Sequence, residues 1–184
     1  MNQYFYDRIE NSTAHRPIRD ELSGEVLNNK DLLQHLLAIA FNVKDKNHHK
    51  ACWTMELVFE AKIEWLSDYL DEFCKTLSSF TNESAMRPVS KTCLFAAQKN
   101  QKAPGFLNGK QITQIIEACF DWLINPDGKV ATKAYAMRAL YIFGKKEDWI
   151  YPELQTILSQ DFPNHTAAYQ AAAKDILKKI NKHK

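Results

Sequence analysis

The chain has 184 residues, of which 45% are hydrophobic and 25% are charged, and its formal net charge is +2. This length is enough for a domain with its own core, and the composition is that of a globular protein. The small net charge gives no reason by itself to expect nucleic acid as a ligand. With only 5 glycines and 6 prolines the chain is poor in turn residues, so we expect few, long elements.

The first residues, Met1–Arg8, contain no basic region followed by an apolar run, so they do not have the pattern of a signal peptide. No apolar stretch approaches the roughly 20 residues that a membrane-spanning helix needs. We therefore expect a cytoplasmic protein that makes no contact with a membrane.

The cysteines are too far apart in the sequence for a zinc knuckle or a redox CxxC pair. Each stands among apolar residues of a predicted helix, which favours reduced thiols in the core. A redox sensor or a chance pair is the alternative. The four residues are Cys52, Cys74, Cys93 and Cys119.

The N-terminal segment differs from the rest of the chain. Residues 1–17 are polar and irregular apart from Tyr4-Phe5-Tyr6, and we expect a loose arm whose aromatic residues dock on the body. A short helix is predicted over residues 18–27. The sequence is therefore divided into an N-terminal arm with a short helix, residues 1–29, and a helical repeat domain, residues 30–184.

Helical periodicity becomes clear from Asp31 onward, where apolar residues recur one turn apart along one helix face. The same reasoning extends to the C-terminus. It predicts helices over residues 31–40, 48–60, 63–80, 83–98, 111–124, 126–143, 149–159 and 166–181.

Prolines, glycines and asparagines mark several boundaries of these helices. Pro88 is expected to bend the helix over residues 83–98 near its start. Asn125-Pro126 is typical of a cap followed by proline at the first helical position, and Gly144 is expected to end that helix. A turn is predicted at residues 161–164.

The sequence contains an approximate internal repeat. Residues 50–59 align with residues 133–142 at a shift of 83, with Lys, Ala and Leu coinciding, and Lys91-Thr92-Cys93 lies halfway between. The shift corresponds to two units of about 41 to 42 residues, which is the length of two-helix HEAT or armadillo units.

On this spacing the chain resembles a short HEAT-like α-solenoid over residues 30–182. It departs from the usual HEAT consensus because Pro, Asp and Arg do not recur at fixed places in each unit. The resemblance implies an all-α protein, a right-handed α-α superhelix of about four stacked antiparallel helix pairs. Stacking has a physical reason, since each pair alone has too little core and its neighbours supply apolar surface.

Residues 83–91, 119–123 and 133–137 are similar to segments of short bacterial proteins that are often labelled adenylosuccinate lyase. That superfamily has a mobile Gly-Ser-Ser-x-Met-Pro-x-Lys-x-Asn loop, which binds carboxylates and supplies a serine base. The nearest match here is Ser84–Lys91, but Arg87 separates Met from Pro, and the glycines and the Asn are missing.

The chain is also less than half as long as the lyases, and it contains no phosphate-binding loop, no HExxH and no GxSxG. Asp68, Asp71 and Glu72 could in principle do acid–base work, but a solvated helix face explains them better. We therefore predict no enzyme, no catalytic residue, no cofactor and no metal site.

Solenoids bind partners along the surface lined by their inner helices, and two sets of residues are candidates for that surface. The basic candidates fall on successive predicted inner helices and would suit phosphate or an acidic peptide if they align. The aromatic candidates suit a protein interface, although core positions are the alternative. The basic residues are Arg87, Lys91, Lys133, Arg138 and Lys174, and the main aromatic residues are Trp53, Tyr135 and Tyr169.

The sequence is compatible with three candidate functions. The first is a scaffold, a monomer or weak homodimer, that holds an unknown protein or peptide. The second is nucleic-acid or phosphate binding, as in the similar helical DNA-alkylation-repeat glycosylases, and it requires the basic residues on one face. The third is an enzyme, which requires a polar pocket with several convergent titratable groups.

Overall fold

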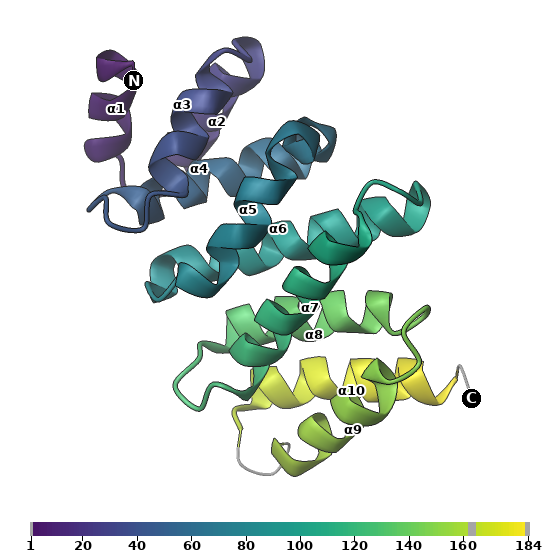
Figure 1. Cartoon of the computed structure of the whole chain (residues 1–184). Helices are drawn as coiled ribbons and strands as arrows, with labels where there is room; N and C mark the ends of the chain where they lie inside the picture. Colours follow the sequence, from purple (N-terminus) through teal and green to yellow (C-terminus); the bar gives the residue numbers. More distant parts are fainter. Residues whose placement is uncertain (1, 162–164, 183–184) are drawn as a thin grey trace.

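The computed structural model describes residues 2–161 and 165–182, and all regular structure in these parts of the chain is helical. Ten α-helices pack in antiparallel pairs that follow one another along the chain (Figure 1). The first five are α1 (Gln3–Glu10), α2 (Arg16–Asn28), α3 (Leu32–Ala40), α4 (His48–Ala61) and α5 (Leu70–Thr76). The others are α6 (Glu83–Lys102), α7 (Gly109–Ile124), α8 (Val130–Phe143), α9 (Ile150–Asp161) and α10 (Ala167–Asn181).

The predicted all-α stack of helix pairs is confirmed, with five pairs in place of about four, while the handedness of the superhelix stays a prediction. The helices form two layers. In the inner layer α2, α4, α6, α8 and α10 each pack against the next member. In the outer layer, made of α1, α3, α5, α7 and α9, the contact is interrupted, and α7 and α9 have no extensive contact.

The extra pair comes from the N-terminal segment, where the prediction of an irregular arm was wrong. Asn2 caps α1 by accepting a hydrogen bond from the backbone N–H of Phe5, and Phe5 and Ile9 are fully buried. Two apolar residues one turn apart are too few to show helical periodicity in the sequence. Packing on the neighbouring helices therefore stabilises this short helix in the folded chain. The pair α1–α2 packs on α3 and α4, across the boundary predicted at residue 29.

The helix predicted over residues 63–80 is divided into three pieces. A 3₁₀ helix, η1 (Ile63–Tyr69), precedes α5, and a short 3₁₀ turn, η2 (Leu77–Ser79), follows it. The apolar residues of this stretch, spaced three and four apart, are buried all the same. A spacing of three and four residues suits both a 3₁₀ helix and an α-helix, so the sequence pattern could not distinguish the two. These residues are Leu66, Leu70, Phe73 and Leu77.

The predicted start of α8 at Pro126 was also wrong. The side chain of Asn125 accepts a hydrogen bond from the Asp127 N–H at 3.0 Å, and its carbonyl accepts one from the Gly128 N–H at 3.1 Å. Residues 125–128 therefore form a turn, and the helix begins at Val130. Of the turn predicted at residues 161–164, residues 162–164 lie outside the described residues, and Asp161 ends α9.

A single apolar core runs through the stack, and all four cysteines lie in it as free thiols, as predicted. Burial raises the pKa of the Cys74 thiol to about 12, and the charge of Asp71 adds to the effect, so this thiol is neutral at physiological pH. None of the described helices combines the length and the apolar character that crossing a bilayer would require.

Gly144 follows the last residue of α8, and a Cβ atom at this position would lie 2.3 Å from the ring of Tyr151. We expect Gly144→Ala to lower the free energy of unfolding by about 1–3 kcal/mol, because the ring must shift to admit the methyl group. Gly109→Ala is the matched control, since its Cβ would meet no atom within 4 Å. Urea unfolding followed by circular dichroism measures both, and equal stability of the two variants would contradict the packing argument.

Candidate functional site

The inner layer contains a groove at the end where α6 and α8 begin. Its volume is about 340 Å³, and it lies between α2, α4, α6 and the residue before α8. Charged side chains and one indole ring dominate its walls. The groove is lined by Ala14, Arg19, Trp53, Glu83, Ser84, Arg87 and Lys129.

Trp53 is held in the wall of the groove by an unusual acceptor. Pro88 lies inside α6 and has no N–H, so the carbonyl of Ser84, four residues earlier, lacks the helical hydrogen bond that residue 88 would otherwise donate. The indole Nε1–H of Trp53 donates to this carbonyl at 2.9 Å, while α6 continues through the proline. The proline therefore provides the acceptor that fixes the tryptophan.

Behind the groove lies a buried carboxylate surrounded by cations. Glu56 of α4 is 2% exposed, and it accepts hydrogen bonds from Arg19 at 3.1 Å and from Lys91 at 2.9 Å. The Arg87 guanidinium lies 3.8 Å away, and Lys91 also reaches Glu60 at 3.2 Å. This charge cluster joins α2, α4 and α6, so it sets the positions of the residues that line the groove.

The ammonium group of Lys91 is committed to this cluster. Desolvation by burial lowers its pKa, but the hydrogen bonds and charges of Glu56 and Glu60 outweigh that effect, so the pKa of Lys91 is raised above its ordinary value. Lys91 thus stays charged and paired at physiological pH.

Positive charge remains in excess at the groove itself. Arg87 is 44% exposed and has only the long contact with Glu56. Lys129 has no ion-pair partner among the described residues, and Glu83 is the one acidic residue in the lining. Two buried polar atoms there lack a hydrogen-bond partner in the described part of the chain, the Arg19 Nε donor and the Glu83 Oε2 acceptor. The excess of positive charge suits the groove to a group that carries negative charge.

Of the residues predicted for the binding surface, Trp53, Arg87 and Lys91 are brought together here. Arg138 is exposed on α8 and Tyr135 is half-buried there, but neither lines the groove. Lys174 is exposed on α10.

Lys133 and Tyr169 are 1% and 0% exposed, so neither is at the surface where a partner could contact it. The Lys133 ammonium lies over the Tyr169 ring, 5.9 Å from its centre. Burial lowers the pKa of Lys133, against the opposing charge of Asp161. The predicted basic stripe is interrupted at this position, because one of its members belongs to the interior.

Sequence reasoning missed Arg19, Glu56 and Lys129. Glu56 had a recognisable signal, since it stands within the apolar run Met55–Phe59 at a buried position of its helix. A charge in such a run needs a counter-charge, which the cations of α2 and α6 supply. Arg19 and Lys129 had no such signal, because the folded stack alone brings them to the groove.

The segment similar to the lyase loop, Ser84–Lys91, forms the first turns of α6, and five of its residues are buried. It is thus part of a packed helix, whereas the lyase loop is mobile. In the described part of the chain, no group of three or more His, Cys, Asp and Glu side chains is placed to hold a metal ion.

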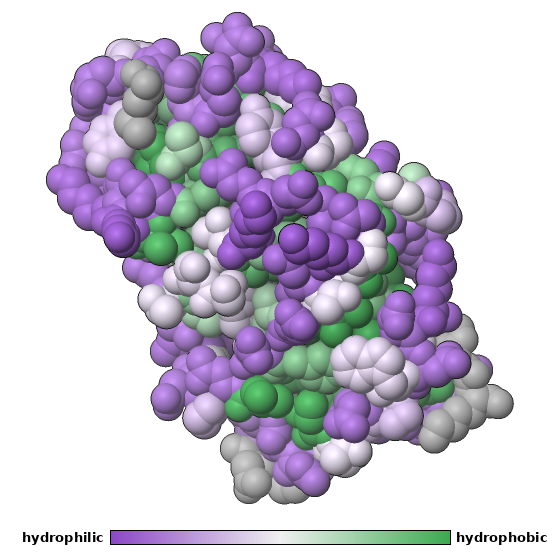
Figure 2. Space-filling model, in the orientation of Figure 1, coloured by the Kyte–Doolittle hydropathy of each residue, from purple (hydrophilic) through white to green (hydrophobic). Residues whose placement is uncertain are grey.

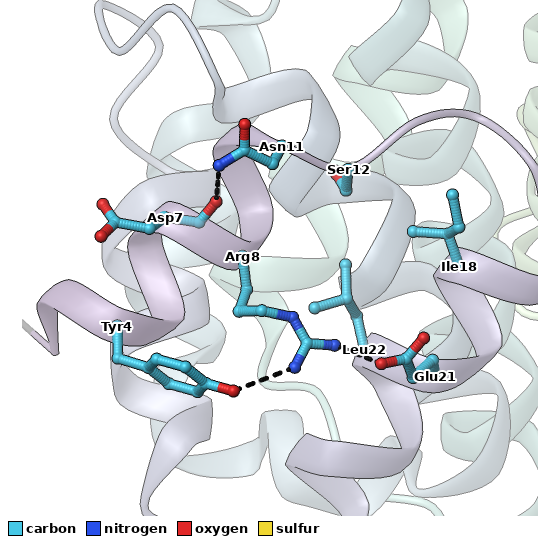
Figure 3. Close-up of a pocket in the computed structure, with 8 residues that line it drawn as sticks. All are labelled: Tyr4, Asp7, Arg8, Asn11, Ser12, Ile18, Glu21 and Leu22. Carbon is cyan, nitrogen blue, oxygen red and sulfur yellow. Dashed lines mark hydrogen bonds and ion pairs between the residues drawn. The ribbon is translucent and has the colours of Figure 1, made fainter.

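A second hollow, of about 290 Å³, lies between α1 and α2 (Figure 3). Arg8 crosses it, donating to the Tyr4 hydroxyl at 3.2 Å and to Glu21 at 2.5 Å, and Glu25 lies 3.4 Å away. Two carboxylates therefore already neutralise its central cation. The hollow is a weaker candidate than the inner groove for binding an anionic group.

We expect Glu56→Gln to destabilise the fold by about 3–5 kcal/mol, because Arg19 and Lys91 would lose a buried counter-charge. Glu60→Gln is the matched control. Glu60 is 45% exposed and its one ion pair among the described residues is with Lys91, so the loss should stay below about 1 kcal/mol. Denaturant unfolding of both variants measures the difference, and similar values for the two would show that the cluster does not hold the layer together.

Comparison with known proteins agrees with this architecture. The model of one family, described as the HEAT repeat domain, matches residues 5–180. No curated protein and no solved structure gives a match. HEAT repeats typically act as protein-interaction scaffolds and are generally non-catalytic. Since the match covers nearly the whole chain, including the pair α1–α2, the protein belongs to the HEAT repeat domain family.

Proposed function

We propose that this protein is a non-enzymatic scaffold that holds a protein or peptide partner on its inner layer, with an acidic segment of the partner in the groove. The observation that carries the proposal is the group of Arg19, Arg87 and Lys129 around Trp53, with Glu83 as the one opposing charge in the lining. Guanidinium groups bind carboxylates through paired hydrogen bonds, and tryptophan supplies a large, rigid contact surface.

A peptide that carries carboxylates can pair with Arg87 and Lys129. Arg87 is 44% exposed with only a long contact to Glu56, and Lys129 has no ion-pair partner among the described residues, so both cations are available to a partner.

Nucleic acid remains the second candidate, and the charges of the inner layer argue against it. Binding to a phosphate backbone requires several unpaired cations in a row. Lys91 is paired with Glu56 and Glu60, and Lys133 is buried, which leaves Arg87 and Lys129 at the groove and Arg138 outside its lining. The formal net charge of +2 adds little general attraction.

The proposal is tested by reversing two groove charges with Arg87→Glu/Lys129→Glu. The matched control is Lys44→Glu/Lys75→Glu, which makes the same change in charge at two exposed residues outside the groove. Tagged proteins are used to recover partners from native lysate, with and without nuclease. Fluorescence anisotropy then measures binding of a labelled glutamate-rich peptide and of a single-stranded oligonucleotide.

We expect a protein partner that is recovered with or without nuclease, and a peptide affinity that falls at least about tenfold in the groove variant alone. A tenfold loss corresponds to about 1.4 kcal/mol, which is modest for reversal of two charges. Tighter binding of the oligonucleotide, lost in the groove variant, would favour the nucleic-acid function. Equal losses in both variants would mean that the groove is not the binding site.

A further inference from the structure

The outer layer contains a second groove, separate from the one on the inner layer. It consists of two adjoining cavities of about 370 and 220 Å³ that share Ile112 and Glu147 in their walls. One lies beside α7 and the residues just before α9, and the other lies between the ends of α6 and α8. Their lining is largely apolar, with the main contributions from Ile112, Ile116, Phe120, Ile142, Phe143 and Trp149.

The groove lies where the outer layer is interrupted. α5 packs against α7, but α7 and α9 have no extensive contact, and the larger cavity lies beside α7 at Glu147 and Trp149, just before α9 begins. Trp149 stacks on Phe120 at this place, with ring centres 5.6 Å apart, and yet remains 52% exposed. Figure 2 shows hydrophobic surface on this side of the molecule, in the lower part of the view where α7, α8 and α9 lie. Apolar surface that one more helix would cover is therefore left open to solvent.

The rim of the groove is acidic and unpaired. Glu117 and Asp121 stand one turn apart on α7, and Glu147 stands in the wall shared by the two cavities. None of these three carboxylates makes a hydrogen bond or an ion pair with another of the described residues. Lys145 and Lys146 line the smaller cavity alone, where Lys145 lies over the Tyr141 ring at 5.5 Å, and the larger cavity has no Lys or Arg in its lining. An occupant that carries cations one turn apart would pair with the rim.

The shape of the groove suits a helix. Ile112, Ile116 and Phe120 lie four residues apart along α7, so they form a ridge about 12 Å long at 1.5 Å per residue. A partner helix with an apolar stripe of two to three turns can place its own ridge beside this one. Basic residues on one side of that stripe would then face Glu117 and Asp121.

A second copy of the chain does not supply such a helix. The apolar faces of its helices are already buried in its own core, and the large apolar residues left exposed in the described chain are Tyr4, Ile124 and Trp149, each on a different element or connection. We infer that the outer groove binds an amphipathic helix of another protein, with an apolar stripe flanked by Lys or Arg residues one turn apart. This inference does not depend on the function proposed for the inner groove.

The test uses a labelled helical peptide of about 16 residues, long enough to be helical alone, that has a leucine stripe flanked by lysines four residues apart. A second peptide has glutamate in place of each lysine. Binding to the full chain is measured by fluorescence anisotropy, and the indole N–H signal of Trp149, assigned with Trp149→Phe, is followed by NMR. The test variants are Trp149→Ala and Glu117→Lys/Asp121→Lys. Glu64→Lys/Glu72→Lys is the matched control, because all four of these acidic residues are exposed.

We expect saturable binding of the lysine peptide, a shift of the Trp149 signal without one of Trp53, and an affinity at least tenfold lower in both test variants. The glutamate peptide should bind at least tenfold more weakly, and the control variant should bind as the natural chain does. Absence of saturable binding, or equal binding of the two peptides, would overturn the inference. Self-association in sedimentation that Trp149→Ala abolishes would overturn it in favour of a second copy.

Discussion

The whole structure depends on the fact that no helix pair buries its apolar face by itself. Each pair presents one helix to the inner layer, and the unbroken succession of contacts from α2 to α10 gives every pair a neighbour on which to close its core. The polar contacts follow from this arrangement. Glu56 is buried because α4 lies between α2 and α6, and the cations that neutralise it can come only from those two neighbours. The inner groove is thus a property of four consecutive pairs, and no single pair contains it.

The sequence was sufficient to predict most of the fold, because long helices with a regular apolar face have a clear periodic pattern of apolar residues. The shift of 83 residues is explained by the structure, since Lys50, Lys91 and Lys133 lie in α4, α6 and α8, which are successive inner helices. The errors occur where local patterns allow two outcomes. Apolar residues three and four apart fit both the 3₁₀ and the α form of residues 63–80, and Asn125-Pro126 fits both a cap and a turn.

The candidate site was harder to predict, because equivalent positions in the repeat contact different neighbours. Lys50 donates to the carbonyl of Glu10 at the end of α1, Lys91 pairs with carboxylates of α4, and Lys133 lies over Tyr169 of α10. Three lysines at equivalent positions of the repeat therefore have three different environments, and Lys133 lies in the interior. Periodicity predicts which helix carries a residue and roughly which way it faces, but the residues packed against it decide whether it is exposed.

Pro88 shows how a residue that interrupts a helix can connect two repeats. Its missing N–H leaves a vacant acceptor on α6, and the only indole of α4 occupies it. The bond crosses from one repeat to the next, so it defines the alignment of α4 and α6 along their axes as well as the orientation of the ring. In a helix with a complete set of internal hydrogen bonds, that carbonyl would already accept one backbone N–H, so it would be a weaker acceptor for the indole. Together with the ion pairs that Lys91 makes to Glu56 and Glu60, this bond resists sliding of the two repeats along each other, and it does so at the wall of the inner groove.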